Sequence, residues 1–395
     1  MSGSSAGVDP PPRRVIGISL LQVAPDRSTG TATYVRNLSW VLVQRARHDY
    51  VFFASAAMAP FWRERLPVEA ARVVSCGPHP HRKALRALYE MFVLPQLAKG
   101  LGVDVLFFPY LVVPVWRRPP IVVTLYDLMF KWTDETDFTW LKKQYIDWST
   151  YRLRKRARHI FTISQFCRRD IIARLGVRPD RVSVTPIGLE TAAELMHSVG
   201  PPRVGEGYLL SVASAYPHKR LDLLVACFER IAAEHPSLRL KLAGTYGSMP
   251  LPLAALRGVV RASPVADRID LVPRLPPAEL AALYRDATAY VSASAFEGFG
   301  IPILEAMAAG CPVAASPAPA VIETLDGHGW IAVDWSGEAL EAAISQAMQA
   351  RRDGPERLLQ ARTRAIEFYR WERAAEEAER VFTFVGESDR PTRTA

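Results

Sequence analysis

Hydrophobic and polar positions along the chain alternate between two patterns, short continuous apolar runs and longer stretches with apolar residues at helical spacing. Continuous runs are typical of strands buried on both faces of a parallel sheet. The predicted strands are 14–20, 50–54, 105–108, 121–125, 159–163, 208–213, 238–244, 269–272, 289–293, 312–315 and 330–333. The predicted helices are 34–42, 81–99 with an interruption at Pro95, 140–158, 221–235, 277–285, 302–309, 337–351 and 355–383. This β/α alternation predicts an α/β protein with parallel sheets.

The chain has 395 residues, which is too long for one ordinary domain. Residues 189–206 contain Gly, Pro and Glu with little periodicity, so we expect them to link two β/α domains, 14–188 and 207–365. Two such domains would carry their loops on facing sheet edges and form a cleft between them. The ends, 1–13 and 386–395, are predicted to be disordered tails.

Composition argues for a globular protein of a reducing compartment. The chain is 49% apolar and 23% charged, and no apolar run approaches the ~20 residues of a membrane span. The N-terminal residues lack the apolar core of a secretory signal, so we expect a cytoplasmic protein. The four cysteines are scattered, which argues against a disulfide framework and against a metal site.

Charge is distributed unevenly between the two halves. Residues 1–190 hold 28 Lys and Arg against 15 Asp and Glu, a net charge of +13, whereas residues 191–395 have a net charge of −4. A basic half suggests an anionic partner such as nucleic acid, an anionic membrane surface or a phosphorylated acceptor. A merely solvated surface is the alternative. The cluster Arg152–Arg158 lacks the interleaved aromatic residues of nucleic-acid sites. Two interpretations of the cluster are left, contact with lipid phosphate and a solvated helix end.

Residues 289–313 carry the strongest chemical signal. A buried strand leads into a glycine-bracketed turn, 297–300, and then into a short helix that ends at Gly310. A helix N-terminus after such a turn binds anions, because its N–H groups and its dipole favour negative charge. Glu297 and Glu305 frame this site, and carboxylates accept hydrogen bonds from hydroxyl groups. The expected ligand therefore carries phosphate and sugar hydroxyls together.

Two further positions in the first half are candidates for ligand contacts. Asp127 follows the strand 121–125, where parallel sheets place ligand-binding groups, although a helix-cap or turn role is equally compatible. The loop that contains Gly30 and Thr31 lies between a buried strand and a helix, and it could be a ligand loop or a structural turn.

The stretch Phe296–Val313 resembles the signature of glycosyltransferase family 4, the retaining enzymes of the GT-B fold. The Glu-x7-Glu pair of that signature is here Glu297 and Glu305, inside a long match that includes Gly-Phe-Gly and Ala-Met-x-x-Gly. The similarity extends over roughly residues 14–385. Other segments that match are Ser164–Asp170, Ile187–Leu189, Tyr216–Leu224, Ala282–Ala287 and Trp371–Ala375.

The resemblance implies two Rossmann-like domains that face each other across a cleft, with a C-terminal helix (366–385) that crosses back to the first. The first domain would bind the acceptor and the second the nucleotide-sugar. Catalytic roles would fall to Glu297 and Asp127. Donor contacts would come from Lys219, Arg220, Ser214, Gly298, Phe299, Gly300, Ile301, Glu305, Gly30 and Thr31. No metal or other cofactor is expected, since the chain has no Asp-x-Asp pair and a lysine with helix amides can stabilise a leaving diphosphate.

Three positions depart from the family pattern. Ser214 stands where relatives often have arginine, Tyr126 precedes Asp127 where many have histidine, and Ile187 replaces an asparagine. The resemblance nevertheless suggests a mannosyltransferase of polysaccharide or lipopolysaccharide assembly. It would use GDP-mannose and a lipid-linked acceptor at the cytoplasmic face of the inner membrane, in peripheral contact with anionic lipid and without nucleic acid. The alternatives are a transferase that uses a UDP-sugar and a soluble acceptor, and a non-catalytic subunit that binds nucleotide-sugars.

Overall fold

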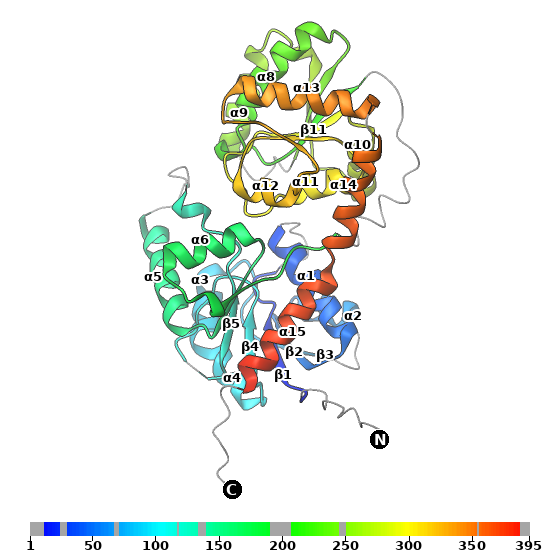
Figure 1. Cartoon of the computed structure of the whole chain (residues 1–395). Helices are drawn as coiled ribbons and strands as arrows, with labels where there is room; N and C mark the ends of the chain where they lie inside the picture. Colours follow the sequence, from blue (N-terminus) through cyan, green and yellow to red (C-terminus); the bar gives the residue numbers. More distant parts are fainter. Residues whose placement is uncertain are drawn as a thin grey trace, which may run out of the picture.

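The computed structural model describes residues 12–23, 30–66, 71–116, 118–132, 140–189, 207–244, 250–353 and 355–387. They form two α/β domains, each with a parallel sheet between layers of helices (Figure 1). Residues 190–206 of the predicted linker 189–206 lie outside the described residues, as do most of both predicted tails, 1–11 and 388–395.

The first domain contains a seven-stranded parallel sheet in the order β3-β2-β1-β4-β5-β6-β7. Its strands are β1 (Val15–Ser19), β2 (Asp49–Ala54), β3 (Ala71–Ser75), β4 (Val105–Phe108), β5 (Ile121–Thr124), β6 (His159–Thr162) and β7 (Val182–Val184). The five predicted strands of this half are confirmed. The sequence pattern missed β3 and β7, which lie at the two edges of the sheet and are less completely buried than the central strands.

The second domain contains a six-stranded parallel sheet in the order β10-β9-β8-β11-β12-β13. Its strands are β8 (Tyr208–Val212), β9 (Arg239–Ala243), β10 (Ile269–Val272), β11 (Ala289–Ser292), β12 (Val313–Ala315) and β13 (Trp330–Ile331). All six predicted strands are confirmed. Since every strand is parallel, the carboxyl ends of β8 and β11 lie at one edge of the sheet, next to the loops that follow them.

Helices cover both faces of each sheet. The first domain has α1 (Gly30–Arg45), α2 (Ala59–Arg65), α3 (Lys83–Leu88), α4 (Leu94–Gly100), α5 (Trp140–Arg156) and α6 (Gln165–Leu175). The second has α8 (Leu221–Glu234), α9 (Pro250–Ala262), α10 (Pro277–Asp286), α11 (Ile301–Ala308), α12 (Pro319–Leu325), α13 (Gly337–Asp353) and α14 (Pro355–Phe368). The sequence pattern missed α2, α9 and α12. In the second domain α8, α9 and α13 share one apolar core, and α10, α11 and α12 contribute to the core on the other face of the sheet.

The predicted interruption near Pro95 takes the form of a π-helical turn, Tyr89–Val93, between α3 and α4. Proline has no N–H and its ring clashes with the carbonyl four residues earlier, which here is Met91. The Met91 carbonyl instead accepts a hydrogen bond of 3.0 Å from the Val115 N–H. The irregular turn thus joins this helix to the loop after β4.

The C-terminal region corrects two predictions. Residues 355–383 form two helices instead of one, α14 and α15 (Trp371–Glu387), separated at Tyr369 and Arg370. The predicted tail also begins later, because Gly386 and Glu387 belong to α15 and Gly386 is buried. The break redirects the chain, so that α15 leaves the second domain and packs beside α1 on the first (Figure 1). The predicted crossing of the C-terminal helix is confirmed.

An aromatic joint connects the domains at this break. The Phe299 ring meets the Tyr369 ring edge-on with centroids 5.4 Å apart, and the Tyr34 ring lies 5.9 Å from the Trp371 ring. The Leu189 N–H donates 2.8 Å to the Tyr369 carbonyl, so the end of the first domain is tied to the same point. Gly188 lies directly against Trp371, where a Cβ would come within 2.4 Å of the Trp371 backbone nitrogen.

We therefore expect Gly188→Ala to lower the free energy of unfolding by about 1–3 kcal/mol, since the neighbouring backbone must move to make room. The matched control is Gly258→Ala in α9, where a Cβ has no neighbour within 4 Å. The control should stabilise the protein by about 0.5–1 kcal/mol, because alanine is the better helix former. Chemical denaturation of the three proteins checks both signs, and equal effects of the two substitutions would contradict the close packing at Gly188.

Candidate active site

The glycine turn lies at the carboxyl edge of the second sheet and connects β11 to α11. Gly300 precedes the helix with φ 96°, a left-handed conformation that glycine adopts without strain. Ile301 begins α11, and Pro302 follows in its first turn, where a missing N–H costs no helical hydrogen bond. The predicted strand, turn and helix N-terminus are therefore in place.

An ion pair lies beside this turn. Lys219 ends a 3-10 turn (Pro217–Lys219) in the loop between β8 and α8, and its Nζ donates 2.6 Å to Glu297 Oε1. Ser294 Oγ donates 2.8 Å to the same oxygen. The side chains of Lys219 and Glu297 are 18% and 15% exposed, so the ion pair is mostly buried but reaches the surface. This pairing brings together two residues that are 78 positions apart in the sequence.

Glu305 lies in the second turn of α11 and accepts a hydrogen bond of 2.8 Å from the Tyr284 hydroxyl. Burial raises the pKa of Glu305 to about 7, and the Tyr284 hydrogen bond offsets only part of that effect. A carboxylate that is desolvated in the free protein gains by accepting hydrogen bonds from ligand hydroxyls. The geometry is therefore compatible with the predicted sugar contact.

Asp127 of the first domain approaches the same turn. A Cβ on Gly298 would lie 2.8 Å from Asp127 Oδ2, so any larger residue there would displace the Asp127 carboxylate. Asp127 Oδ1 also accepts a hydrogen bond of 3.0 Å from the Met129 N–H, and this is the turn role that was the alternative prediction. Burial raises the pKa of Asp127, and the negative charge of Glu297 raises it further. The two predicted catalytic carboxylates thus come from different domains and interact.

Two helix N-termini meet across the cleft. Gly30 begins α1, and a Cβ at Gly30 would lie 3.4 Å from Ile301 Cδ1 at the start of α11. Thr31 lies in the first turn of α1. Because both helix dipoles are positive at these ends, the space between them favours an anion more than either end would alone.

A polar clasp holds the glycine turn to the first domain. Ser164 caps α6 by accepting a hydrogen bond of 3.1 Å from the Cys167 N–H, and it donates 2.8 Å to the Gly298 carbonyl. The Glu323 carboxylate of α12 accepts 2.7 Å hydrogen bonds from the N–H groups of Gln165 and Phe166. Sequence reasoning missed Glu323, since no local pattern marks a carboxylate whose partners lie about 157 residues away.

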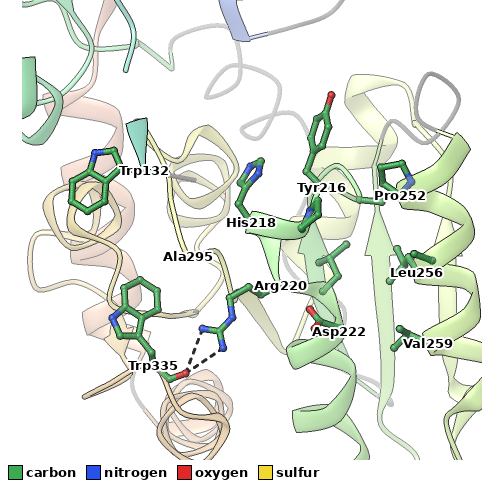
Figure 2. A pocket seen from close by; sticks show the side chains of 14 residues that line it. Trp132, Tyr216, His218, Arg220, Asp222, Pro252, Leu256, Val259, Ala295 and Trp335 are labelled. Atoms are coloured by element: carbon green, nitrogen blue, oxygen red, sulfur yellow. Dashed lines mark hydrogen bonds between the residues drawn. The ribbon is translucent and has the colours of Figure 1, made fainter. Parts of the chain in front are cut away.

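Three other residues that were predicted to contact the donor are Ser214, Arg220 and Phe299. Ser214 lies in the same loop as Lys219. The Arg220 guanidinium donates hydrogen bonds of 3.4 Å to the Trp335 carbonyl (Figure 2). The Phe299 side chain is buried, and its carbonyl accepts a 2.6 Å hydrogen bond from Thr324. Only the backbone amide of Phe299 could therefore serve a ligand.

Metal and membrane features are not found in the described part of the chain. Among those residues, no group of three His, Cys, Asp or Glu side chains could hold a metal ion. No helix among them has the length and apolar character needed to cross a bilayer.

Two facing parallel-sheet domains, with a C-terminal helix that crosses back from the second to the first, define the GT-B class of α/β proteins. The profile of a family described as Glycosyltransferase Family 4 matches residues 28–193. The profile described as Glycosyl transferases group 1 matches residues 194–368. Together the two matches are contiguous over most of the chain, and the chain therefore belongs to glycosyltransferase family 4.

Curated relatives include a D-inositol 3-phosphate glycosyltransferase of Acidothermus cellulolyticus, 31% identical over 42% of this chain and 40% of the relative. An O-antigen chain mannosyltransferase B of Escherichia coli is 27% identical over 52% of this chain and 55% of the relative. The chain thus spans about half the length of the curated relatives it matches.

Solved structures share the fold at low sequence identity. Sucrose-phosphate synthase from Thermosynechococcus elongatus superposes with a TM-score of 0.72 at 18% identity, covering 95% of this chain and 100% of that one. Anabaena HepE, in complex with UDP and glucose, gives a TM-score of 0.68 at 15% identity over 94% of this chain and 100% of that one.

The raised pKa of Glu305 predicts a pH-dependent stability cost. Between the ordinary value of 4.5 and about 7, the unfolded chain loses this proton before the folded protein does, so Glu305 lowers stability as pH rises. We expect Glu305→Gln, which can still accept from Tyr284, to melt roughly 2–4 °C above the unmodified protein at pH 8 and at the same temperature at pH 4.5. Melting curves across this pH range test the prediction. An equal difference in melting temperature at both pH values would show that folding does not raise the pKa of Glu305.

Proposed function

We propose that this chain is a retaining hexosyltransferase that moves a hexose, with mannose from GDP-mannose as the first candidate, to a lipid-linked or polysaccharide-precursor acceptor without a metal ion. The observation that carries the proposal is the Lys219–Glu297 ion pair beside the N-terminus of α11, with Asp127 of the other domain against the same turn. A cation, helix amides and two carboxylates at one cleft suit a ligand that combines a diphosphate with a sugar.

In this proposal the donor lies along the α11 side of the cleft. Lys219 and the amides of Gly298, Phe299 and Gly300 would hold the diphosphate from the second domain. The N-terminus of α1, with Gly30 and Thr31, would approach it from the first. Glu305 would accept hydrogen bonds from the ribose hydroxyls. These groups are pre-organised for the charge that develops on the leaving diphosphate, and such groups contribute most to the stabilisation of a transition state.

In the reaction, the bond between the anomeric carbon and the diphosphate oxygen breaks, and a bond from the acceptor hydroxyl oxygen to that carbon forms. The acceptor proton passes to the leaving diphosphate, so no separate base is required. Glu297 and Asp127 would stabilise the positive charge of the sugar ring as the bonds exchange. Lys219 would pass from its ion pair with Glu297 to the diphosphate.

Mannose is favoured by the mannosyltransferase named among the relatives. A UDP-sugar is the second candidate donor, because the HepE structure of the same fold contains UDP and glucose. A thermal-shift panel of GDP-mannose, UDP-glucose and ADP-glucose separates these candidates. We expect one donor to stabilise the protein by about 2.7 kcal/mol at a hundredfold excess over its Kd. Lys219→Ala and Glu305→Ala should each abolish that shift.

A turnover measurement separates the enzyme from a non-catalytic subunit. The measured rate is the release of nucleoside diphosphate from the donor that stabilises the protein in the thermal-shift panel. This rate should fall by about 100-fold or more in Glu297→Gln, because the loss of one group that stabilises a transition state typically has an effect of this size. The matched control is Glu341→Gln. Glu341 of α13 pairs with Arg230 of α8, away from the glycine turn, so this variant should retain full turnover. Donor turnover that is unchanged in Glu305→Ala would overturn the donor assignment.

An exposed apolar and basic face of the first domain supports a lipid-linked acceptor. We call it the α3–α5 face and define it by Leu85, Leu88, Phe92, Val93, Trp116, Trp148 and Tyr151 with Arg82, Lys83, Arg152 and Arg156. The parts are contiguous, because Trp116 Nε1 donates 3.0 Å to the Phe92 carbonyl and Arg156 donates 3.0 Å to the Val115 carbonyl. Exposed tryptophan and leucine beside arginine and lysine suit the interface of an anionic membrane.

Binding to vesicles tests this face. Leu88→Glu with Phe92→Glu should reduce sedimentation with phosphatidylglycerol vesicles by about tenfold or more, since two desolvated apolar contacts are replaced by repelled charges. The control is Leu359→Glu with Phe384→Glu, which changes two equally exposed side chains on other surfaces. Binding of the unmodified protein should also weaken with salt. Vesicle binding that neither salt nor the first pair changes would rule out the α3–α5 face as the contact, and absence of vesicle binding would favour the soluble acceptor.

A further inference from the structure

Trp132 of the first domain lies against the glycine turn of the second. It follows Asp127 by five residues, in the segment after β5, and its ring centroid is 6.0 Å from that of Phe296. Phe296 is buried and directly precedes Glu297. Trp132 is therefore close along the chain to one proposed catalytic carboxylate, and it packs beside the chain neighbour of the other.

Two side chains of α6 fix the orientation of the Trp132 ring. Its Nε1–H donates 2.9 Å to Asp170 Oδ2, and the Arg174 guanidinium lies over the ring, 4.3 Å from the centroid. Arg174 also donates 2.6 Å to Asp170 Oδ1, so each of the three side chains contacts the other two. Asp170 is 8% exposed, and a carboxylate with so little water favours a conformation in which both oxygens accept hydrogen bonds. The indole is thus held by its polar edge and by one face.

A small apolar cluster next to this ring spans the two domains. Its buried members come from both of them and are Phe166, Cys167, Phe296 and Ala320. Trp132 lies at the edge of the cluster, with its ring centroid 5.8 Å from that of Phe166. Met129 also packs against the cluster, and its N–H donates to Asp127. The segment from Asp127 to Trp132 is therefore attached to the same cluster that contains Phe296.

The rest of the Trp132 ring lines a hollow of about 1000 Å³, which leaves the side chain 46% exposed. Figure 2 shows Trp132 and Trp335 on one side of this hollow and residues of α9 on the other. Of the described residues that line the hollow, Trp132 alone belongs to the first domain. A half-exposed ring loses less apolar contact on separation than a buried one, so its contact with the second domain can break and form as the cleft opens and closes.

We propose that Trp132 is a positioning residue. Anchored by Asp170 and Arg174, it holds Phe296 in place and thereby sets the position of Glu297 relative to Asp127 in the closed cleft. The inference rests on the proposed function, which gives these two carboxylates their roles. A misplacement of about 1 Å can lower a rate by about 100-fold. Donor affinity would change little, because Lys219 and Glu305 bind the donor from the second domain.

Thiol labelling tests the contact without any donor. Cys167 is buried and its Sγ donates 3.2 Å to the Gly298 carbonyl, so a reagent reaches it only when the two domains separate at this point. We expect Trp132→Ala to speed the alkylation of Cys167 by iodoacetamide about tenfold, and Asp170→Ala to speed it about threefold.

The labelling experiment has internal and external controls. Peptide mass spectrometry distinguishes Cys167 from Cys227 and Cys311, which are buried within the second domain and should keep their slow rates in every variant. Trp40→Ala removes a tryptophan of α1 that is 49% exposed, and it should leave the rate at Cys167 unchanged.

Turnover then tests the positioning of Glu297, with the donor that stabilises the protein in the thermal-shift panel. Trp132→Ala should lower kcat about 10- to 100-fold while the Kd for the donor stays within about twofold. Trp132→Phe, which keeps a ring for Phe296 but has no N–H, should fall between the two. Trp132→Ala combined with Asp170→Ala should lose no more than Trp132→Ala alone, because Asp170 acts through the indole. Trp40→Ala should retain full turnover.

The results separate this proposal from the proposed function. An unchanged labelling rate of Cys167 in Trp132→Ala would overturn the positioning role, whatever the donor panel shows. Faster labelling of Cys227 and Cys311 as well would assign Trp132 to general stability and overturn it too. A loss of donor affinity in place of kcat would make Trp132 part of the donor site and would also overturn it. If no donor binds the unmodified protein, the proposed function fails, and the labelling rates still decide whether Trp132 holds the glycine turn.

Discussion

The carbonyl oxygen of Gly298 is the point at which the two domains determine each other's geometry. It accepts 2.8 Å from Ser164 Oγ and 3.2 Å from Cys167 Sγ, and both donors belong to the start of α6 in the first domain. Asp127 of the same domain lies against the Gly298 Cα. Since Glu297 precedes this residue, the conformation of the turn that carries it depends on contacts from the opposite domain. Neither domain alone would contain the complete site.

Several carboxylates lie at or near the clasp and have little water around them. Glu323 accepts two amide hydrogen bonds at the N-terminus of α6, where the helix dipole favours a carboxylate. Glu297 is neutralised by Lys219, while Asp127 and Glu305 are desolvated and have raised pKa values. Carboxylates that have lost so much of their hydration are costly to maintain in the free protein. Such a cost is typical of a site whose ligand supplies the missing hydrogen-bond partners.

The sequence predicted the strand, turn and helix that carry the candidate site of the second domain, because their signals are local. A buried strand, a glycine turn and a helix start within twenty residues show where Glu297 and Glu305 lie. The resemblance to family 4 added Lys219, which no spacing would connect to Glu297. Elements with weaker patterns were missed, among them the edge strand β3 and the helices α2, α9 and α12. The predicted single helix 355–383 was wrong because its break at Tyr369 depends on packing against Phe299 and not on a local helix-breaking residue. Glu323 and the hollow beside Trp335 arise only from tertiary contacts.

The interface between the domains contains two kinds of contact with different costs of separation. At the clasp, hydrogen bonds from Ser164 and to Glu323 can be exchanged for hydrogen bonds to water at a net cost of only about 0.5–1.5 kcal/mol each. At the joint, Phe299 against Tyr369 and Trp371 against Tyr34 bury aromatic surface that water would not compensate. A movement that opens the cleft for substrates would therefore cost least if the clasp separates and the aromatic joint remains packed. That movement withdraws Ser164 and Asp127 from Gly298 together. When the cleft closes, the Asp127 carboxylate and the Ser164 hydrogen bond that supports the glycine turn would therefore return in one step.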